Sequence, residues 1–439
     1  MTDLLAARYQ MAISLAFHII YASIGMTMPF FMFVAEYKWI KTGKEVYLEL
    51  AKAWSKGVAI FFAIGAVSGT VLSFELGLLW PEFMKHAGSI IGMPFSWEGA
   101  AFFTEAIALG LFLYGWKRLK KHVHLAFGLL IGIAGVASGF FVIAANGWMN
   151  SPEGFNWING KAYNIDPVDA MFNAAWISQS THMTIAAFAA TGFGVAGLHA
   201  LLLLRGKYPE FHRKAYRIAL TFGAVAALVM PISGDFSAKN VAKRQPEKLA
   251  AMESLFVTQE RAPLLIGGIP DAKAQQVKYA IKVPGFLSFL AFGRLDAEVK
   301  GLDQFPPDEW PPVLLTHISF QIMILIGVLM AAIALCYVIF SLRWKNLLEK
   351  PLWLKILMFA TPLGYLAIET GWMVTELGRQ PWIIYRIMRT EDALTSMPGI
   401  IYTLLVIISI YTLLTVLSFF LIKRQIRYVH EVKDKISAN

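Results

Sequence analysis

Nine runs of about 20 apolar residues alternate with more polar segments along the chain. Each run is long enough to cross the hydrocarbon core of a bilayer as a helix, because an α-helix rises about 1.5 Å per residue. The predicted spans are 11–36, 57–80, 97–116, 124–146, 179–204, 216–233, 316–342, 353–377 and 398–422. The pattern therefore predicts an all-α integral membrane protein with nine transmembrane helices.

Lysine and arginine residues gather in every second connection of this pattern. The segments after the first, third, fifth and seventh spans carry most of them, together with the C-terminal tail. The positive-inside rule then places the N-terminus outside and the C-terminus in the cytoplasm. The net charge of +10 lies largely on the cytoplasmic face, where contact with anionic lipid explains it and no nucleic-acid partner is needed.

Composition agrees with a membrane protein, since 57% of the residues are hydrophobic and only 15% are charged. A soluble chain would carry about 25% charged residues. The single cysteine, Cys336, lies in an apolar run, so disulfides contribute nothing. No cleavable small-residue site follows the first apolar run, which we therefore interpret as a span and not as a signal peptide.

One connection is much longer than the others. Residues 234–315 are polar and fall on the external side of the predicted topology, and 241–259 are predicted to form a helix. Because long loops are usually functional or disordered, and this one carries several large aromatic residues, we expect a partly folded functional lid. The chain thus divides into spans at 1–233, an external segment at 234–315, and spans plus a cytoplasmic tail at 316–439.

The stretch AIETGWMVTELGRQPW, residues 367–382, carries the densest chemistry. Glu369 and Glu376 are seven residues apart, which puts them on one helical face, and Trp372 precedes Glu376 by one turn. A bland alternative is a helix end at the headgroup level, with Glu376 in water and Trp382 in the aromatic belt. Because a carboxylate within a membrane helix is costly, two of them beside Trp372 and Arg379 favour a cofactor site.

Three further residues belong to the same outer layer of the predicted bundle. His182 and Met323 fall at a depth similar to Glu376, and His18 falls somewhat deeper on the same side. A lone histidine or methionine on an apolar helix is more often a packing residue. Four potential iron ligands at similar depth on four helices favour a bundle that holds several hemes.

Glu98 and Glu105 form another pair seven residues apart, about 10 Å along one helical face. They either line a water-filled cavity or form a proton relay to a buried site, and their descent towards the cytoplasm favours the relay. Glu75 is a further intramembrane acid without an assigned role.

Three motifs together resemble subunit I of the cytochrome bd quinol oxidases. These are GRQPW after the eighth span, ANGWMNSP ending at Pro152, and QPEKLAAMES at 245–254. The resemblance covers essentially the whole chain. It implies a respiratory enzyme of the bacterial cytoplasmic membrane that reduces oxygen to water with electrons from quinol, using two hemes b and one heme d.

The resemblance also implies roles for individual residues. His182 and Met323 match the two axial ligands of a low-spin heme b, while His18 and Glu376 match the ligands of two high-spin hemes. The remaining matches are Trp372 between the hemes, Glu98 and Glu105 on the proton path, Arg379 at the cofactor site, and Lys248 and Glu253 as quinol residues of the external loop.

The implied mechanism takes electrons and protons from quinol at the outer face and draws the protons for water from the cytoplasm, without a pump. The implied partners are subunit II, a small single-span accessory subunit, quinol, oxygen and membrane lipid. Gln321 departs from the family pattern, in which many members carry arginine, and its lack of charge should lower the potential of the low-spin heme. The loop also lacks the insertion of the long-loop members.

Two other classes of function fit parts of the pattern. A transporter or channel would use the intramembrane glutamates without a cofactor, and a heme b anchor would bind heme without reacting with oxygen. The sequence leaves open whether the third heme is d or a further high-spin b, which of His18 and Glu376 serves the oxygen-binding heme, and whether the quinol is ubiquinol or menaquinol.

Overall fold

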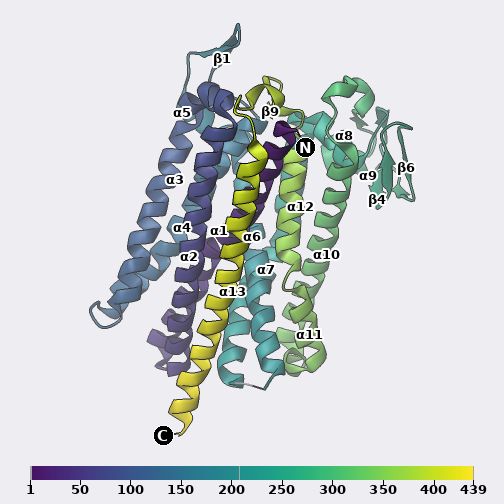
Figure 1. The fold of residues 1–439 in the computed structure, drawn as a ribbon. Helices are drawn as coiled ribbons and strands as arrows, with labels where there is room; N and C mark the ends of the chain where they lie inside the picture. Colours follow the sequence, from purple (N-terminus) through teal and green to yellow (C-terminus); the bar gives the residue numbers. More distant parts are fainter. Residues whose placement is uncertain (1, 207, 439) are drawn as a thin grey trace.

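The computed structural model describes residues 2–206 and 208–438 as a bundle of long helices that lie side by side (Figure 1). The long helices are α1 (Asp3–Thr42), α2 (Glu45–Leu79), α3 (Pro81–Gly115), α4 (Lys121–Asn150), α6 (Trp176–Leu204), α7 (Pro209–Arg244), α10 (Val313–Arg343), α11 (Pro351–Ala360), α12 (Leu363–Leu377) and α13 (Ile400–Ala438). Three short helices connect them, α5 (Pro167–Met171), α8 (Pro246–Glu253) and α9 (Phe286–Phe292).

The two ends of the bundle differ in what they carry. The N-terminal end holds the start of α1, the short helices α8 and α9, and all the β-hairpins (Figure 1). The C-terminal end holds the connection between α3 and α4 and the end of α13 (Figure 1). The candidate residues of α8 and of the loop after α12 therefore meet at the N-terminal end.

Within the described residues, eight segments are long and apolar enough to cross a membrane. They are α1, α2, α4, α5 with α6, α7, α10, α11 with α12, and α13. Helix α3 has 35 residues but is not among them, and two glutamates, Glu98 and Glu105, interrupt its apolar part. The all-α membrane class agrees with the prediction, while the ninth span and the sidedness of the termini stay predictions.

The predicted helix at 241–259 is confirmed only in part, because it breaks at Gln245 and ends at Glu253. Helix α7 runs through 234–240 and ends at Arg244, and α8 begins at Pro246. The break lies at Gln245, because proline disfavours a helical conformation in the residue before it. Helix α8 then ends at Ser254, whose backbone is left-handed with φ of 52°.

Small residues bring the helices around the centre into close contact. A Cβ atom on Gly192 of α6 would lie 2.4 Å from the Cα of Gly223 on α7. A Cβ on Gly197 would meet the main chain of Leu357, next to the interruption at Thr361 and Pro362 that separates α11 from α12. Such close approach is how membrane helices gain packing energy without a hydrophobic driving force.

The segment between α7 and α10 is folded. It contains three antiparallel pairs of short strands: β3 (Gln259–Glu260) with β8 (Glu298–Val299), β4 (Leu264–Ile266) with β7 (Ile281–Val283), and β5 (Ile269–Asp271) with β6 (Gln276–Lys278). Two further hairpins lie in other loops, β1 (Asn156–Ile158) with β2 (Lys161–Tyr163) and β9 (Trp382–Ile384) with β10 (Met388–Arg389). The segment packs its own apolar cluster, which includes Leu249, Phe256 and Leu302.

Gln321 and His317 of α10 fasten this external segment to the bundle. The Gln321 side chain accepts a hydrogen bond from Gly267 N (2.9 Å) and donates one to Leu265 O (3.0 Å). His317 is fully buried, and its ring nitrogens contact Met252 O (2.7 Å) and Gly267 O (3.2 Å). The loop is thus held over the N-terminal end of α10.

Candidate functional site

Two histidines on different helices have the same surroundings. His18 Nδ1 of α1 lies 3.0 Å from Ser68 Oγ of α2, and His182 Nδ1 of α6 lies 3.0 Å from Ser233 Oγ of α7. Each serine hydroxyl also donates to a main-chain carbonyl one helical turn earlier, Ile64 O for Ser68 and Met230 O for Ser233.

These contacts are compatible with the Nδ1–H tautomer of each ring. A hydroxyl has one proton, and a serine that gives it to the main chain accepts a hydrogen bond from the histidine Nδ1–H. In a neutral imidazole the Nε2 atom then carries a lone pair. A ring held at Nδ1 with Nε2 unprotonated is the usual form of a histidine that ligates iron.

A glycine follows each of these serines and leaves room beside the ring. A Cβ on Gly69 would lie 3.0 Å from His18 Cε1, and a Cβ on Gly234 would lie 3.7 Å from His182 Cε1. Met323 of α10 also faces a glycine, since a Cβ on Gly371 of α12 would lie 3.0 Å from its Sδ. Each of these three side chains thus packs against the backbone of a neighbouring helix at a glycine.

Helix α12 brings the candidate residues to neighbouring positions. Trp372 follows Gly371 and donates from its indole nitrogen to Met183 Sδ, 3.3 Å away, next to His182. The same indole belongs to an apolar cluster with Ile19, which neighbours His18. Trp372 therefore lies between the two histidine-bearing helices, and its place between cofactors stays a prediction.

Glu376 lies one turn further along α12 and is held at both oxygens. Asn146 of α4 donates to its Oε1 at 2.6 Å, and Arg379 donates to its Oε2 at 2.6 Å. The Arg379 side chain is 3% exposed, and its Nε also donates to Trp382 O. The GRQPW turn thus orients the carboxylate, which is more exposed than the guanidinium that neutralises it.

The two acids of α3 both face α4. Glu98 Oε1 accepts from Ser138 Oγ at 3.2 Å, and a Cβ on Gly135 would lie 3.3 Å from Glu105 Oε2. A further acid, Glu36, was not predicted from the sequence. It lies nearer the C-terminal end of the bundle, where its Oε1 pairs with His124 Nδ1 at 2.7 Å. Both partners of this pair are buried.

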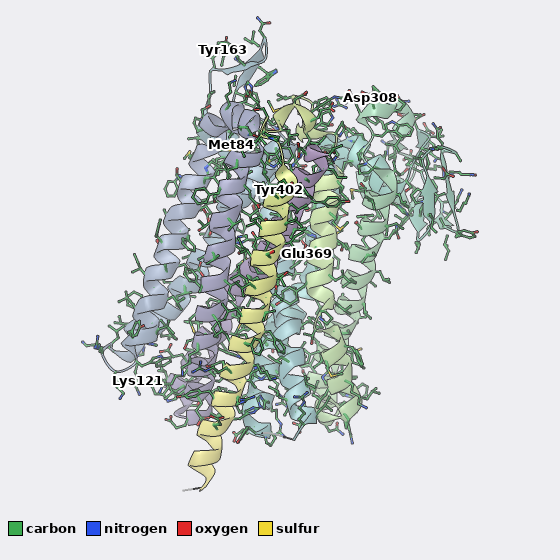
Figure 2. The ribbon with its side chains drawn as sticks, in the orientation of Figure 1. Met84, Lys121, Tyr163, Asp308, Glu369 and Tyr402 are labelled. Carbon is green, nitrogen blue, oxygen red and sulfur yellow. The ribbon has the colours of Figure 1, made fainter. Side chains whose placement is uncertain are left out.

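Glu75 and Glu369 are the other acids within the bundle. Glu75 Oε1 accepts from Gln10 and Ser14 of α1, and Gln10 accepts in turn from Thr403 of α13, so this acid ties three helices together. Figure 2 places Glu369 about midway along the bundle. In the described part of the chain, its buried Oε1 has no hydrogen-bond partner.

Lys248 and Glu253 of α8 are both buried, at 3% and 4% exposed. Lys248 Nζ donates to Asn150 Oδ1 of α4 at 2.6 Å. Burial lowers the pKa of Lys248 to about 7, with the Arg379 guanidinium acting in the same direction. Burial raises the pKa of Glu253 to about 8. Because charged groups are costly to bury, each of these pKa shifts favours the neutral form of the side chain.

The donor set fits heme. Among the residues that the structure describes, no three His, Cys, Asp or Glu side chains form a metal-binding group. Each candidate ligand instead offers iron one donor, which suffices when a porphyrin supplies the four equatorial nitrogens. The glycines Gly69, Gly234 and Gly371 let the side chains of His18, His182 and Met323 pack directly against helix backbone.

Comparison with known proteins places this arrangement in context. A family model described as cytochrome bd terminal oxidase subunit I matches residues 6–430. The chain is 37% identical over 408 residues to the putative cytochrome bd menaquinol oxidase subunit I of Bacillus subtilis (strain 168), with 91% of each chain covered. It is 32% identical to the cytochrome bd ubiquinol oxidase subunit 1 of the same organism, covering 90% of this chain and 86% of that one.

A solved structure is also similar along nearly the whole length. The match to the bd oxidase from Geobacillus thermodenitrificans has a TM-score of 0.92 and 36% sequence identity, and it covers 97% of this chain and 98% of that one.

Proposed function

The chain belongs to the cytochrome bd terminal oxidase subunit I family, and we propose that it oxidises quinol at the outer face and reduces oxygen to water with protons from the cytoplasm. The observation that carries this proposal is the matched pair His18–Ser68 and His182–Ser233, in which a serine of the following long helix contacts Nδ1 of each ring. Membership of the family also supports a quinol oxidase subunit that spans a bacterial membrane and works with a subunit II.

The cofactors that we propose are two hemes b and a heme d, or a further high-spin heme b in its place. His182 and Met323 would hold the low-spin heme, while His18 and Glu376 would each hold one high-spin heme. When bound, these groups carry electrons and activate oxygen. The number of protein ligands would determine how many coordination positions of each iron stay open. A His–Met pair would fill both positions that the porphyrin leaves.

Lys248 and Glu253 would bind quinol and accept its proton. A base works best when its pKa lies near the operating pH, and the pKa of Glu253, raised to about 8, meets this condition. Lys248 retains N–H groups beyond the one that it gives to Asn150, so it can hold a quinol oxygen. Because both side chains are buried, quinol has to enter between α8 and the bundle.

Protons for water would travel along one face of α4. Ser138 contacts Glu98, Gly135 faces Glu105, and Gly128 lies near Glu36, where a Cβ would be 3.8 Å from its Oε2. Residues 128, 135 and 138 recur at helical spacing and therefore share a face. We propose Glu36 with His124 as the cytoplasmic entrance, followed by Glu105 and then Glu98.

The proposed topology has nine spans, with α3 as the third, an outer N-terminus and a cytoplasmic C-terminus in the inner membrane. Residues 1–233 and 316–439 would form the spans and 234–315 the quinol loop. The exposed apolar faces of α10 and α13 leave surface for subunit II and for a small accessory subunit.

A test uses the complex purified with its subunit II and reconstituted in vesicles. We expect quinol-driven oxygen consumption, carbon monoxide binding to reduced high-spin heme, and release of as many outer protons as electrons passed. A pyridine hemochrome spectrum identifies the hemes. A protein without a Soret band would contradict the proposal in favour of a transporter, and low-spin heme that does not bind carbon monoxide would favour a heme b anchor.

A further inference from the structure

Four buried or half-buried side chains form a continuous row from the loop helix α8 to α12. Lys248 Nζ donates to Asn150 Oδ1 at 2.6 Å, and Asn150 Nδ2 donates to Asn146 Oδ1 at 3.1 Å. Asn146 Nδ2 then donates to Glu376 Oε1 at 2.6 Å. We call Lys248, Asn150, Asn146 and Glu376 the asparagine bridge, because two amides of α4 join the candidate quinol residue to the candidate heme ligand.

The direction of every hydrogen bond in the bridge follows from its carboxylate end. A carboxylate accepts only, so the amide nitrogen of Asn146 must face Glu376 and its oxygen must face Asn150. The nitrogen of Asn150 then faces Asn146, and its oxygen faces Lys248. All donors therefore point from α8 towards α12, and turning over one amide would place like atoms against each other at both of its ends.

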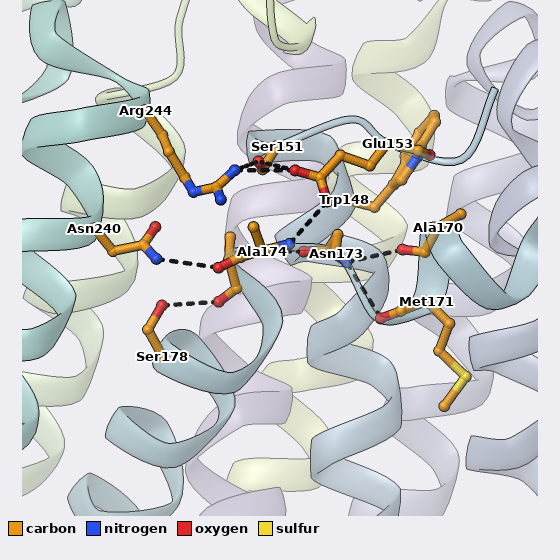
Figure 3. A network of polar contacts seen from close by, with 11 residues as sticks. Trp148, Ser151, Glu153, Ala170, Met171, Asn173, Ala174, Ser178, Asn240 and Arg244 are labelled. Atoms are coloured by element: carbon orange, nitrogen blue, oxygen red, sulfur yellow. Dashed lines mark hydrogen bonds and ion pairs between the residues drawn. The ribbon is translucent and has the colours of Figure 1, made fainter. Parts of the chain in front are cut away.

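The surroundings hold the bridge in place. Asn150 is 1% exposed and is the last residue of α4. Immediately after it, Ser151 and Glu153 accept hydrogen bonds from Arg244 of α7, at 2.8 and 3.0 Å (Figure 3). Glu153 also accepts from Ala174 N at 3.1 Å (Figure 3). The joint between α7 and α8 is thus fixed to the residues that directly follow Asn150.

The stem of Lys248 also touches the helix that carries Glu376. A Cβ on Gly378, which follows the end of α12, would lie 2.8 Å from Lys248 Cγ. A bulkier residue there would displace the lysine. Lys248 is therefore linked to α12 in two ways, through its aliphatic chain at Gly378 and through the amides of Asn150 and Asn146.

We propose that Asn150 is a positioning residue that couples the quinol site to the Glu376 site. When quinol contacts Lys248, the hydrogen bond from Lys248 to Asn150 changes, and through Asn146 so does the hydrogen bond that Glu376 receives. A carboxylate that loses a donor becomes a more basic ligand, which stabilises ferric iron and lowers the potential of the heme it holds. This inference rests on the function proposed above.

Two variants separate the bridge from simple packing. Asn150→Ala removes all three hydrogen bonds of this amide, those to Lys248, to Asn146 Oδ1 and to the main-chain carbonyl Asn146 O. Asn150→Asp keeps the shape and still accepts from Lys248, but it places a second acceptor against Asn146 Oδ1 and so forces that amide to turn over. Asn240 is a matched control at the same end of the bundle, because its Nδ2 donates to a main-chain carbonyl, Ala174 O, at 3.0 Å (Figure 3).

The experiment titrates each heme of the purified complex spectroelectrochemically, with and without a hydroxyquinoline N-oxide that blocks the quinol site. In the wild type we expect the blocker to shift one high-spin heme by a coupling factor of about fivefold or more. This factor corresponds to about 40 mV, at 59 mV per factor of ten for one electron. Asn150→Ala and Asn150→Asp should abolish that shift, while Asn240→Ala and Asn240→Asp should retain it.

Several outcomes would overturn the coupling. They are an active wild type whose high-spin hemes ignore the blocker, an Asn150 variant with the full shift, and an Asn240 variant that loses it equally. If Asn150→Ala lost its hemes, the isosteric Asn150→Asp would show whether the blocker-induced shift depends on the amide of Asn150. Failure of the proposed function is distinguishable, because the wild-type complex would then lack heme bands or blocker-sensitive oxygen consumption.

Discussion

The His18 and His182 sites use the same local device in different settings. In each, the serine of a Ser–Gly pair on the following long helix contacts the imidazole at Nδ1, and the glycine packs against the ring. The sites differ in what α12 brings close to them. Met323 lies against Gly371, next to the Trp372 that contacts Met183 beside His182, whereas Leu15 and Ile19 on the His18 helix pack in the apolar cluster of Trp372.

This difference supports the two kinds of heme site proposed above. His182 with the thioether of Met323 would hold a heme that only transfers electrons. His18, which lies among apolar side chains, would hold one of the high-spin hemes. In this proposal the serine orients each histidine, and the residue opposite determines what the site can bind.

The largest expected effect comes from removing the ligands themselves. His182→Ala and Met323→Leu should each abolish the low-spin α band and leave some high-spin heme, whereas His18→Ala should remove high-spin heme and spare the low-spin band. Reduced-minus-oxidised spectra of the purified complex measure this. An intact low-spin spectrum in both His182→Ala and Met323→Leu would mean that the two sites are assigned wrongly.

The next effect comes from filling the glycine spaces, which are not equally tight. Gly69→Ala places a methyl group 3.0 Å from the rigid ring of His18, while Gly234→Ala places one 3.7 Å from His182, an ordinary contact distance. We expect Gly69→Ala to lower high-spin heme content by about tenfold, with Gly234→Ala close to the wild type. Heme per protein, from pyridine hemochrome spectra, is the measurement, and equal losses would contradict the steric argument.

Much of this comparison could be predicted from the sequence. Long apolar runs predict the helices, and the depth of His182, Met323 and Glu376 within them indicates one layer of ligands. The serines could not be predicted, because Ser68 and Ser233 also bond to their own helices and look like ordinary membrane-helix serines. Their histidines lie 50 and 51 residues away in the sequence, and only the packing of α1 on α2 and of α6 on α7 brings them together.

The loop was harder to predict. A charged residue such as Lys248 is normally expected at the surface, but α8 lies against α7, α10 and the loop after α12, which buries it. The proline at 246 was visible in the sequence, and it marked the break that the predicted helix at 241–259 ignored. Asn150 lies in the ANGWMNSP motif, yet its contact with Lys248 joins residues that are 98 positions apart in the sequence.

A smaller effect should come from the quinol loop and should leave both histidine sites unchanged. Lys248→Ala and Glu253→Ala should raise the quinol KM or lower kcat by about a hundredfold, the lower end for acid–base groups. The low-spin band under dithionite should be unchanged, and oxygen consumption driven by a donor that bypasses quinol should survive. Normal quinol oxidation by both variants would place the quinol site elsewhere on the outer face.

The pH dependence sharpens the role of Glu253. Its pKa is raised to about 8, so it is mostly protonated at pH 7 and can accept a proton only in the fraction that is ionised. For a base, kcat/KM for quinol should therefore rise with pH up to about 8, and Glu253→Gln should remove that rise. Steady-state oxygen consumption across pH 6 to 9 (roughly the range around this pKa) measures it, and an unchanged profile in Glu253→Gln would exclude this carboxylate as the base.

The smallest expected effect comes from the serines, and it separates orientation from ligation. Ser233→Ala and Ser68→Ala remove the acceptor of each Nδ1–H, which makes the imidazole a weaker donor to iron and should raise the midpoint potential of the corresponding heme. Heme affinity should fall by no more than about tenfold, since the ligand itself remains. Each variant should shift only its own heme, the low-spin heme for Ser233→Ala and a high-spin heme for Ser68→Ala. Spectroelectrochemical titration resolves the hemes separately, and Ser237→Ala on α7, whose hydroxyl donates to Ser178 O, is a matched control. If Ser233→Ala shifted the high-spin hemes as much as the low-spin one, the serine would act through helix packing and not through the tautomer of His182.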